Sequence, residues 1–182
     1  MLQLNLKIKK FTKNNKILRK YICTNQAGKN ISPSLSWAKI SEVKSYALIL
    51  EDPDAVIGNF VHWYLPFIDP SITTISSLDY NDSENKKKEN KKEKNSNQTI
   101  KIIHGKNTLG EIGYHGPCAP PKSGIHRYIF TLYALNGKLD FSTLGNLQIK
   151  SSANFENILK KNKIEILSFD KKEFHYSYKD FN

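Results

Sequence analysis

Residues 45–51, SYALILE, form a short apolar run that stops at a proline turn. A run of this length, bounded by a turn signal, is typical of a strand buried on both faces. Two further segments, 60–68 (FVHWYLPFI) and 127–135 (RYIFTLYAL), are rich in the aromatic and β-branched residues that strands favour. These three segments predict the centre of a β-rich fold.

Further strands are predicted at both ends of the chain. Residues 2–8 alternate strictly between apolar and polar side chains, which indicates a half-buried strand. Near the C-terminus, 163–169 (KIEILSF) and 173–181 (EFHYSYKDF) predict a closing pair of strands. TNQAGKN (24–30) is polar and predicts a loop.

One helix is predicted, over residues 151–161 (SSANFENILKK). Ser151 or Ser152 is a suitable N-cap, and Phe155, Ile158 and Leu159 fall on one face. Many short strands and one late helix favour a mainly β protein built as an antiparallel sandwich.

The length of 182 residues predicts one domain spanning 1–182. Residues 81–98 contain no hydrophobic residue, which predicts a disordered Lys/Asn-rich insert within that domain. The chain has no apolar stretch long enough to cross a membrane, and its first residues alternate where a signal peptide has a continuous apolar run. These observations predict a soluble, cytoplasmic protein.

The formal net charge of +11 raises the question of nucleic-acid binding. Residues 81–98 contribute only +2, from six Lys against three Glu and one Asp. The other lysines are scattered, with 7–10 (KIKK) and 159–163 (LKKNK) the densest groups. Scattered lysines indicate a solvated surface, so nucleic acid is not the expected partner.

The chain has two cysteines, Cys23 and Cys118, without a metal-binding spacing. In a reducing compartment two free thiols are expected. A disulfide between them is the alternative.

Residues able to carry chemistry gather in three segments. Asp52 and Asp54 follow the first buried strand, and His62 begins the next. The loop 113–124 (GYHGPCAPPKSG) is stiffened by prolines, and His126 follows it directly. Two imidazole donors facing one cleft would suit a phosphate or carboxylate, with Asp52 orienting one ring and favouring its charged form. The plain alternatives are a packed His-Trp pair, an ordinary Asp-Pro-Asp turn and an ordinary loop.

In this order, the segments resemble the phosphatidylethanolamine-binding proteins, also called Raf kinase inhibitor-like proteins. The similarity rests on SPSLSW (32–37), SYALILEDPDA (45–55), the His-Trp pair at 62–63 and GPCAPPKSGIHRYIFTLYAL (116–135). The sequences of 105–107 (GKN) and 113–118 (GYHGPC) resemble the bacterial-type branch of the family more than the mammalian one. The resemblance implies a Greek-key β-sandwich with a few short helices and a small anion pocket.

The resemblance also assigns residues to that pocket. The matching ligand-binding residues are Asp52, His62, Pro121, His126 and Tyr128, with Phe60 and Tyr114 at the rim. Arg127 is expected to brace a neighbouring carboxylate, because adjacent strand residues point to opposite faces. Glu51 and Asp54 are expected to be turn or surface charges. Val56 stands where the family usually has a proline, so a trans peptide bond is expected there.

The expected function is therefore non-enzymatic binding of a phosphate-bearing group, on a phospholipid head group or a phosphorylated partner. Modulation of a protein kinase or another signalling protein and peripheral membrane contact are further expectations from the family, and no cofactor or metal is expected. Two alternatives stay open. One is an enzyme, using Asp52, His62 and His126 on zinc or as a hydrolase, or Cys118 as a nucleophile. The other is a basic surface that binds anionic partners.

Overall fold

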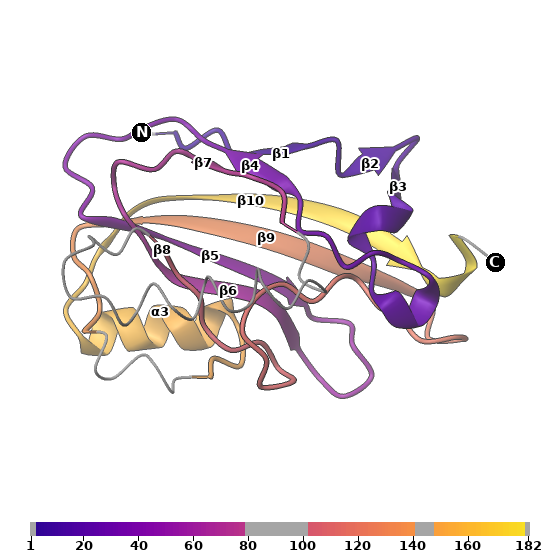
Figure 1. The fold of residues 1–182 in the computed structure, drawn as a ribbon. Helices are drawn as coiled ribbons and strands as arrows, with labels where there is room; N and C mark the ends of the chain where they lie inside the picture. The colour runs from indigo at the N-terminus through magenta and orange to yellow at the C-terminus, as the bar shows by residue number, and fades with distance from the viewer. Residues whose placement is uncertain (1–2, 79–101, 141–147, 181–182) are drawn as a thin grey trace.

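A computed structural model describes residues 3–78, 102–140 and 148–180 (Figure 1). Its largest sheet has five antiparallel strands in the order β10–β9–β5–β6–β8. Their bounds are β5 Ser45–Asp52, β6 Phe60–Ile68, β8 Ile102–Ile103, β9 Ile125–Leu135 and β10 Ile166–Ser177. β5 therefore lies in the middle, between β9 and β6.

A smaller sheet packs against one face of the large one. It has the order β1–β4–β7, with β1 Lys7–Lys9, β4 Ser34–Ser36 and β7 Thr74–Ile75. A short hairpin of β2 (Thr12–Lys13) and β3 (Lys16–Ile17) follows β1. Three 3-10 turns complete the described structure: η1 Arg19–Tyr21, η2 Thr24–Gln26 and η3 Tyr178–Asp180. The mainly β, antiparallel fold class predicted from the sequence is confirmed.

The position of β5 between two cores explains why its middle, residues 46–50, is apolar. Tyr46, Leu48 and Leu50 point into a core shared with the small sheet. Ala47 and Ile49 point to the opposite face, into a second core beneath the helix. A strand covered on both sides has no solvent-facing position, so the polar alternation of a half-buried strand is lost.

The helix α3 (Ser152–Lys161) covers the second core. Ser151 is its N-cap, and the Ser151 side chain accepts a hydrogen bond from the backbone N–H of Asn154 at 3.1 Å. Phe155 and Leu159 are buried, and the Phe155 ring lies edge-on to Tyr64 with 5.7 Å between ring centroids. The predicted helix and its buried face are confirmed, with Ile158 only partly buried.

Two strand predictions at the chain ends need correction. The N-terminal strand covers only Lys7–Lys9, because Asn5 has a positive φ of 50° that interrupts extended backbone. Leu4 and Leu6 are nevertheless buried, as the alternation predicted. The predicted closing pair of strands is wrong: β10 is one continuous strand that pairs with β9 from Ile166 to Ser177.

The expectation of two free thiols is also wrong. Cys23 and Cys118 form a disulfide that joins positions 95 residues apart in the sequence. The open alternative of the sequence interpretation is therefore the observed one.

Some predictions fall outside the described residues. The Lys/Asn-rich insert at 81–98 lies there, and with it the prediction of its disorder. Within the described ranges no helix is both long and apolar enough to cross a membrane.

Candidate functional site

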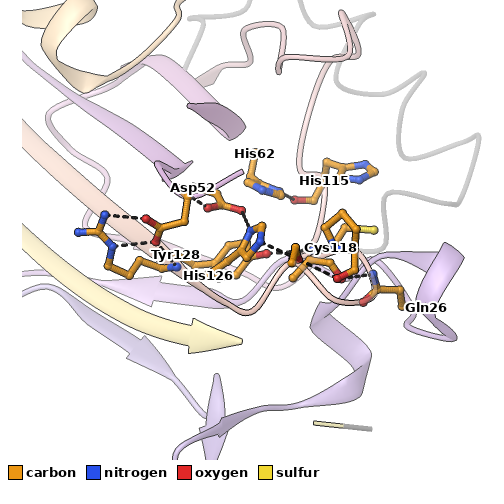
Figure 2. A network of polar contacts seen from close by, with 12 residues as sticks. Gln26, Asp52, His62, His115, Cys118, His126 and Tyr128 are labelled. Atoms are coloured by element: carbon orange, nitrogen blue, oxygen red, sulfur yellow. Dashed lines mark hydrogen bonds and ion pairs between the residues drawn. The ribbon is translucent and has the colours of Figure 1, made fainter. Parts of the chain in front are cut away.

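The site is assembled by the three central strands at one end of the large sheet. Asp52 is the last residue of β5, His62 lies near the start of β6, and His126 and Tyr128 lie near the start of β9. Because β5 is antiparallel to both neighbours, the end of β5 meets the starts of β6 and β9. Figure 2 shows the four side chains converging there.

Asp52 and His126 form a buried pair. The Asp52 Oδ2 atom lies 2.7 Å from His126 Nδ1, and both residues are at most 2 % exposed (Figure 2). The other carboxylate oxygen accepts the backbone N–H of Asp54 at 2.9 Å. A carboxylate accepts hydrogen bonds, so Nδ1 carries a proton and Nε2 points elsewhere. That second nitrogen lies 2.9 Å from the hydroxyl of Ser123.

His62 was expected to donate a hydrogen bond to the ligand, but its donor nitrogen faces the protein instead. Its Nδ1 lies 2.8 Å from the carbonyl oxygen of His115 (Figure 2). A carbonyl only accepts, so Nδ1 carries the proton. Burial, reinforced by the nearby His115, lowers the pKa of His62 from 6.5 to about 3. The ring is therefore neutral near pH 7, and its Nε2 is an acceptor.

Tyr128 closes the inner wall of the site. It is fully buried, and its hydroxyl accepts the backbone N–H of Cys118 at 3.2 Å. Its ring lies 5.2 Å from that of His62, centroid to centroid, at a steep angle. Burial and then the negative charge of Asp52 raise the pKa of Tyr128, so the phenol keeps its proton.

The two expected rim residues have different outcomes. The Phe60 ring is half-buried and lies 4.5 Å from that of His62, centroid to centroid, at the edge of the site. Tyr114 is buried, and its hydroxyl donates to the carbonyl of Tyr21. Its ring packs edge-on against Trp63 in the main core, and its place at the rim stays a prediction.

Pro121 is exposed. It lies in the loop segment that runs from the buried Ala119 to the half-buried Ser123. Here the structure brings together Asp52, His62, His126 and Tyr128, while Pro121 belongs to the loop that carries Ser123. Ligand binding by these five residues stays a prediction.

Arg127 braces a carboxylate, as expected. Its Nε donates to one carboxylate oxygen of Asp54 and a terminal nitrogen to the other, each at 2.8 Å. The hydrogen bond from Arg127 lowers the pKa of Asp54 to about 2. The ion pair with Arg127 therefore holds Asp54, and the turn after β5, against the start of β9. No peptide bond in the described residues is cis, so the bond before Val56 is trans, as expected.

Glu51 is not a surface charge, contrary to expectation. It is 7 % exposed, and its carboxylate accepts the backbone N–H and the hydroxyl of Ser152 and the side-chain amide of Asn59. Ser152 begins α3, so the carboxylate sits at the positive end of the helix dipole. The sequence places Glu51 beside a turn, but the helix that buries it comes 101 residues later.

The loop 113–124 forms one wall of the site, and contacts with residues 21–30 hold it in place. Besides the disulfide, Asn30 Oδ1 accepts the N–H of Gly116 at 2.7 Å, and Gln26 donates to the carbonyl of Ala119 at 2.6 Å. A Cβ on Gly116 would lie 2.3 Å from the carbonyl oxygen of Tyr21. Only glycine permits this approach.

Of the enzymatic alternatives considered from the sequence, the thiol nucleophile and the zinc site are not supported, while the hydrolase is not tested. Cys118 is not a free thiol. Among the described residues no group of three or more His, Cys, Asp and Glu could hold a metal ion. In His126 both nitrogens already face protein oxygens.

Two residues of the site were missed by the sequence interpretation, Ser123 and His115. Both belong to the loop 113–124 that the sequence singled out. The His115 ring is half-buried, and its centroid lies 5.9 Å from those of both Phe60 and His62. The only signal for Ser123 was its position three residues before His126.

The sequence profile of the family described as "Phosphatidylethanolamine-binding protein" matches residues 7–170, which includes every residue of this site. The chain belongs to this family. A UPF0098 protein of Methanothermobacter thermautotrophicus is 39 % identical over 142 residues, covering 75 % of this chain and 80 % of the relative. A UPF0098 protein of Pyrococcus horikoshii is 36 % identical over 140 residues, covering 76 % of this chain and 63 % of its own length.

Solved structures of phosphatidylethanolamine-binding protein homologues share the fold. CT736 from Chlamydia trachomatis superposes with a TM-score of 0.65 and 26 % identity, covering 94 % of this chain and 95 % of its own. YbcL of Escherichia coli has a TM-score of 0.69 at 20 % identity, covering 97 % and 99 %, which supports the fold alone. The family predicted from the sequence, with bacterial members among its neighbours, is confirmed. Membership supports a binding protein of this type.

Proposed function

We propose that the protein binds a phosphate-bearing group at the site formed by Asp52, His62, His126 and Tyr128, with Phe60 and Pro121 at its edge. The observation that carries the proposal is the burial of two imidazoles and a carboxylate at one end of an apolar sheet. Even when buried ionisable groups are paired, as Asp52 and His126 are, they stabilise a fold no better than apolar side chains of similar volume. A cluster of this kind is therefore retained for recognition more readily than for stability.

The fixed tautomers support a ligand that has both acceptors and a donor. The half-buried ring of His115 borders His62, and an imidazole N–H can donate to a phosphate oxygen. His62 Nε2 requires a donor from the ligand, because Nδ1 is committed to His115. Phosphoethanolamine supplies both kinds of group, since its phosphate accepts and its ammonium donates. A sulfate dianion supplies acceptors alone.

The burial of the site residues restricts how much of a lipid can reach them. Asp52, His62, His126 and Tyr128 are each at most 3 % exposed. The half-buried residues Phe60, His115 and Ser123 border them, so a ligand approaches from that side. We propose that a head group enters while acyl chains stay outside, and that a phosphorylated partner protein is recognised through the same group. Regulation of a protein kinase remains a prediction from the family, as does contact with a membrane surface.

An NMR titration with phosphoethanolamine, phosphate and sulfate tests the proposal. We expect the imidazole signals of His62 and His126 to shift and saturate with phosphoethanolamine, and binding to be weakest for sulfate. His62→Ala and His126→Ala should each weaken binding more than tenfold, a loss of about 1.4 kcal/mol or more. Circular dichroism of each variant establishes that it is folded.

His175 provides the matched control. It is an exposed histidine on β10, paired with Glu173 on the surface. His175→Ala should bind phosphoethanolamine as the parent does. Unchanged binding in folded His62→Ala and His126→Ala variants would place the ligand elsewhere. Binding lost in proportion to added salt, with no response of either buried histidine, would favour the basic-surface alternative.

A further inference from the structure

Ser123, His126 and Asp52 form a linear hydrogen-bonded series. The Ser123 hydroxyl lies 2.9 Å from His126 Nε2, and His126 Nδ1 lies 2.7 Å from the Asp52 carboxylate. We infer that Ser123 is a nucleophile, activated by His126 and supported by Asp52, that accepts the acyl group of a small carboxylic ester. This inference goes beyond the proposed function and does not depend on phosphate binding.

The proton positions suit a serine nucleophile. Because Asp52 Oδ2 accepts from Nδ1, a neutral His126 has its lone pair on Nε2, directed at the serine oxygen. The carboxylate is fixed in turn by the N–H of Asp54 at 2.9 Å. A base oriented by a buried carboxylate and bonded to a hydroxyl is the arrangement that generates a serine nucleophile on unrelated folds.

The Ser123 hydroxyl has a second acceptor within reach. Its oxygen lies 2.7 Å from the carbonyl of Pro120, so its one proton points either to that carbonyl or to His126. Rotation about the Cβ–Oγ bond moves the proton between them without moving the oxygen. The contact with Pro120 therefore holds the oxygen at hydrogen-bonding distance from Nε2.

The backbone presents the hydroxyl at the surface. Ser123 closes a tight turn, with its N–H 3.2 Å from the carbonyl of Pro120. Lys122 and Gly124 flank it with positive φ values of 67° and 90°. The serine is half-buried, whereas His126 and Asp52 are at most 2 % exposed. A substrate can thus reach the nucleophile while the base and the carboxylate are kept from water.

The inferred step balances without a further reagent. The Ser123 oxygen attacks the ester carbonyl carbon, and its proton passes to His126 Nε2. The bond from carbon to the leaving oxygen breaks, and that oxygen takes the proton from the imidazole, which leaves an alcohol and an acyl-serine. Water then attacks the acyl-serine with His126 as base, and the acid is released. Gly124 follows the nucleophile in the sequence, and we assign its backbone N–H as the hydrogen-bond donor to the developing oxyanion.

An apolar face beside the nucleophile suits the acyl part of a small ester. The Phe60 ring supplies that face next to His62. Near pH 7 His62 is neutral, and its Nε2 accepts hydrogen bonds. Nε2 therefore gives no second donor for the oxyanion, so we expect slow acyl transfer.

The experiment measures covalent labelling of the full chain by a fluorophosphonate, followed by mass spectrometry. The serine oxygen displaces fluoride from phosphorus, which leaves a stable phosphonyl adduct. We expect one adduct per chain, on Ser123, and loss of more than tenfold in the labelling rate with Ser123→Ala or Asp52→Asn. With p-nitrophenyl acetate we expect a burst of nitrophenol followed by slow turnover.

Ser71 is the matched control. Its hydroxyl bonds the Asp69 carboxylate at 2.5 Å on the surface, without an imidazole. Ser71→Ala should be labelled as fast as the parent. No adduct on the parent, or an adduct that persists in Ser123→Ala, would overturn the inference. Titration of the same samples with phosphoethanolamine separates the two proposals: binding without labelling removes this inference alone, and labelling without binding removes the proposed function alone.

Discussion

At the scale of single residues, His62 shows how one backbone contact decides the chemistry of a side chain. The sequence predicts an imidazole donor, because histidine beside a carboxylate in a cleft favours its charged form. The carbonyl of His115 instead fixes the proton on Nδ1, and burial keeps the ring neutral. Which carbonyl meets which nitrogen depends on the packing of two distant segments, which no local pattern encodes.

The neutral state of His62 predicts an acid-sensitive fold. Its folded pKa of about 3 lies below the ordinary 6.5, so between these values the unfolded chain binds a proton that the folded chain does not. Stability is fully present above pH 6.5 and is lost as the pH falls toward 3. We expect urea unfolding to show a loss on the order of 2 kcal/mol between pH 7 and pH 4.5 that is attributable to His62.

His62→Gln removes this titration and should reduce the difference between the two pH values, whatever its effect at pH 7. The exposed His175→Gln should leave the difference unchanged. An equal pH dependence in the parent and in His62→Gln would mean that His62 titrates normally in the folded state.

Other residues were predictable to different degrees. Strand alternation predicted that Arg127 braces a neighbouring carboxylate, and the structure identifies that carboxylate as Asp54. The burial of Tyr114 in the main core was not predicted, because its segment is a loop, and a loop sequence does not reveal which of its side chains enters the core. Ser123 was missed for the opposite reason, since a serine beside glycine is ordinary in any turn.

At the scale of elements, strongly patterned segments were predicted well. β5, β6 and β9 have sequences that suit only buried strands, and α3 has both a cap and an apolar face. β10 was divided in two because the charged stretch around Lys171 and Lys172 resembles a turn. Those charges are tolerated because much of β10 faces solvent while its backbone pairs with β9.

The cap of α3 predicts a defined loss of stability. Ser151→Ala removes the acceptor for the N–H of Asn154, so we expect the free energy of unfolding to fall by about 1 kcal/mol in urea titrations. Asn157→Ala, on the exposed face of the same helix, is the control and should leave stability unchanged or slightly raised. An equal response of the two variants would contradict the capping role.

At the scale of the whole molecule, the disulfide joins the N-terminal segment to the wall of the site. Its partners are 95 residues apart, so the sequence offered no local signal for the pairing. Disulfides persist in oxidising compartments, which weighs against the cytoplasmic location expected from the sequence.

The disulfide predicts a redox-dependent stability. Closing a loop of this length restricts the unfolded chain, and removing such a bond typically costs about 2–5 kcal/mol. We expect a reductant, or the double variant Cys23→Ser with Cys118→Ser, to lower the free energy of unfolding by this amount in urea titrations. The double variant should not respond to the reductant. Two titratable thiols in native protein purified without reductant would contradict the pairing.

β10 has a consequence for how the molecule behaves beside its own copies. It forms one border of the five-stranded sheet in the described structure, and a bordering strand of twelve residues is a template on which another chain can add. Its central residues, Asp170, Lys171, Lys172 and Glu173, are charged, and Asp170 already accepts the N–H of Leu6. A second copy that paired there in the symmetric antiparallel register would place Lys171 opposite Lys172 and Asp170 opposite Glu173. The same residues that made β10 look like a turn thus discourage the protein from polymerising.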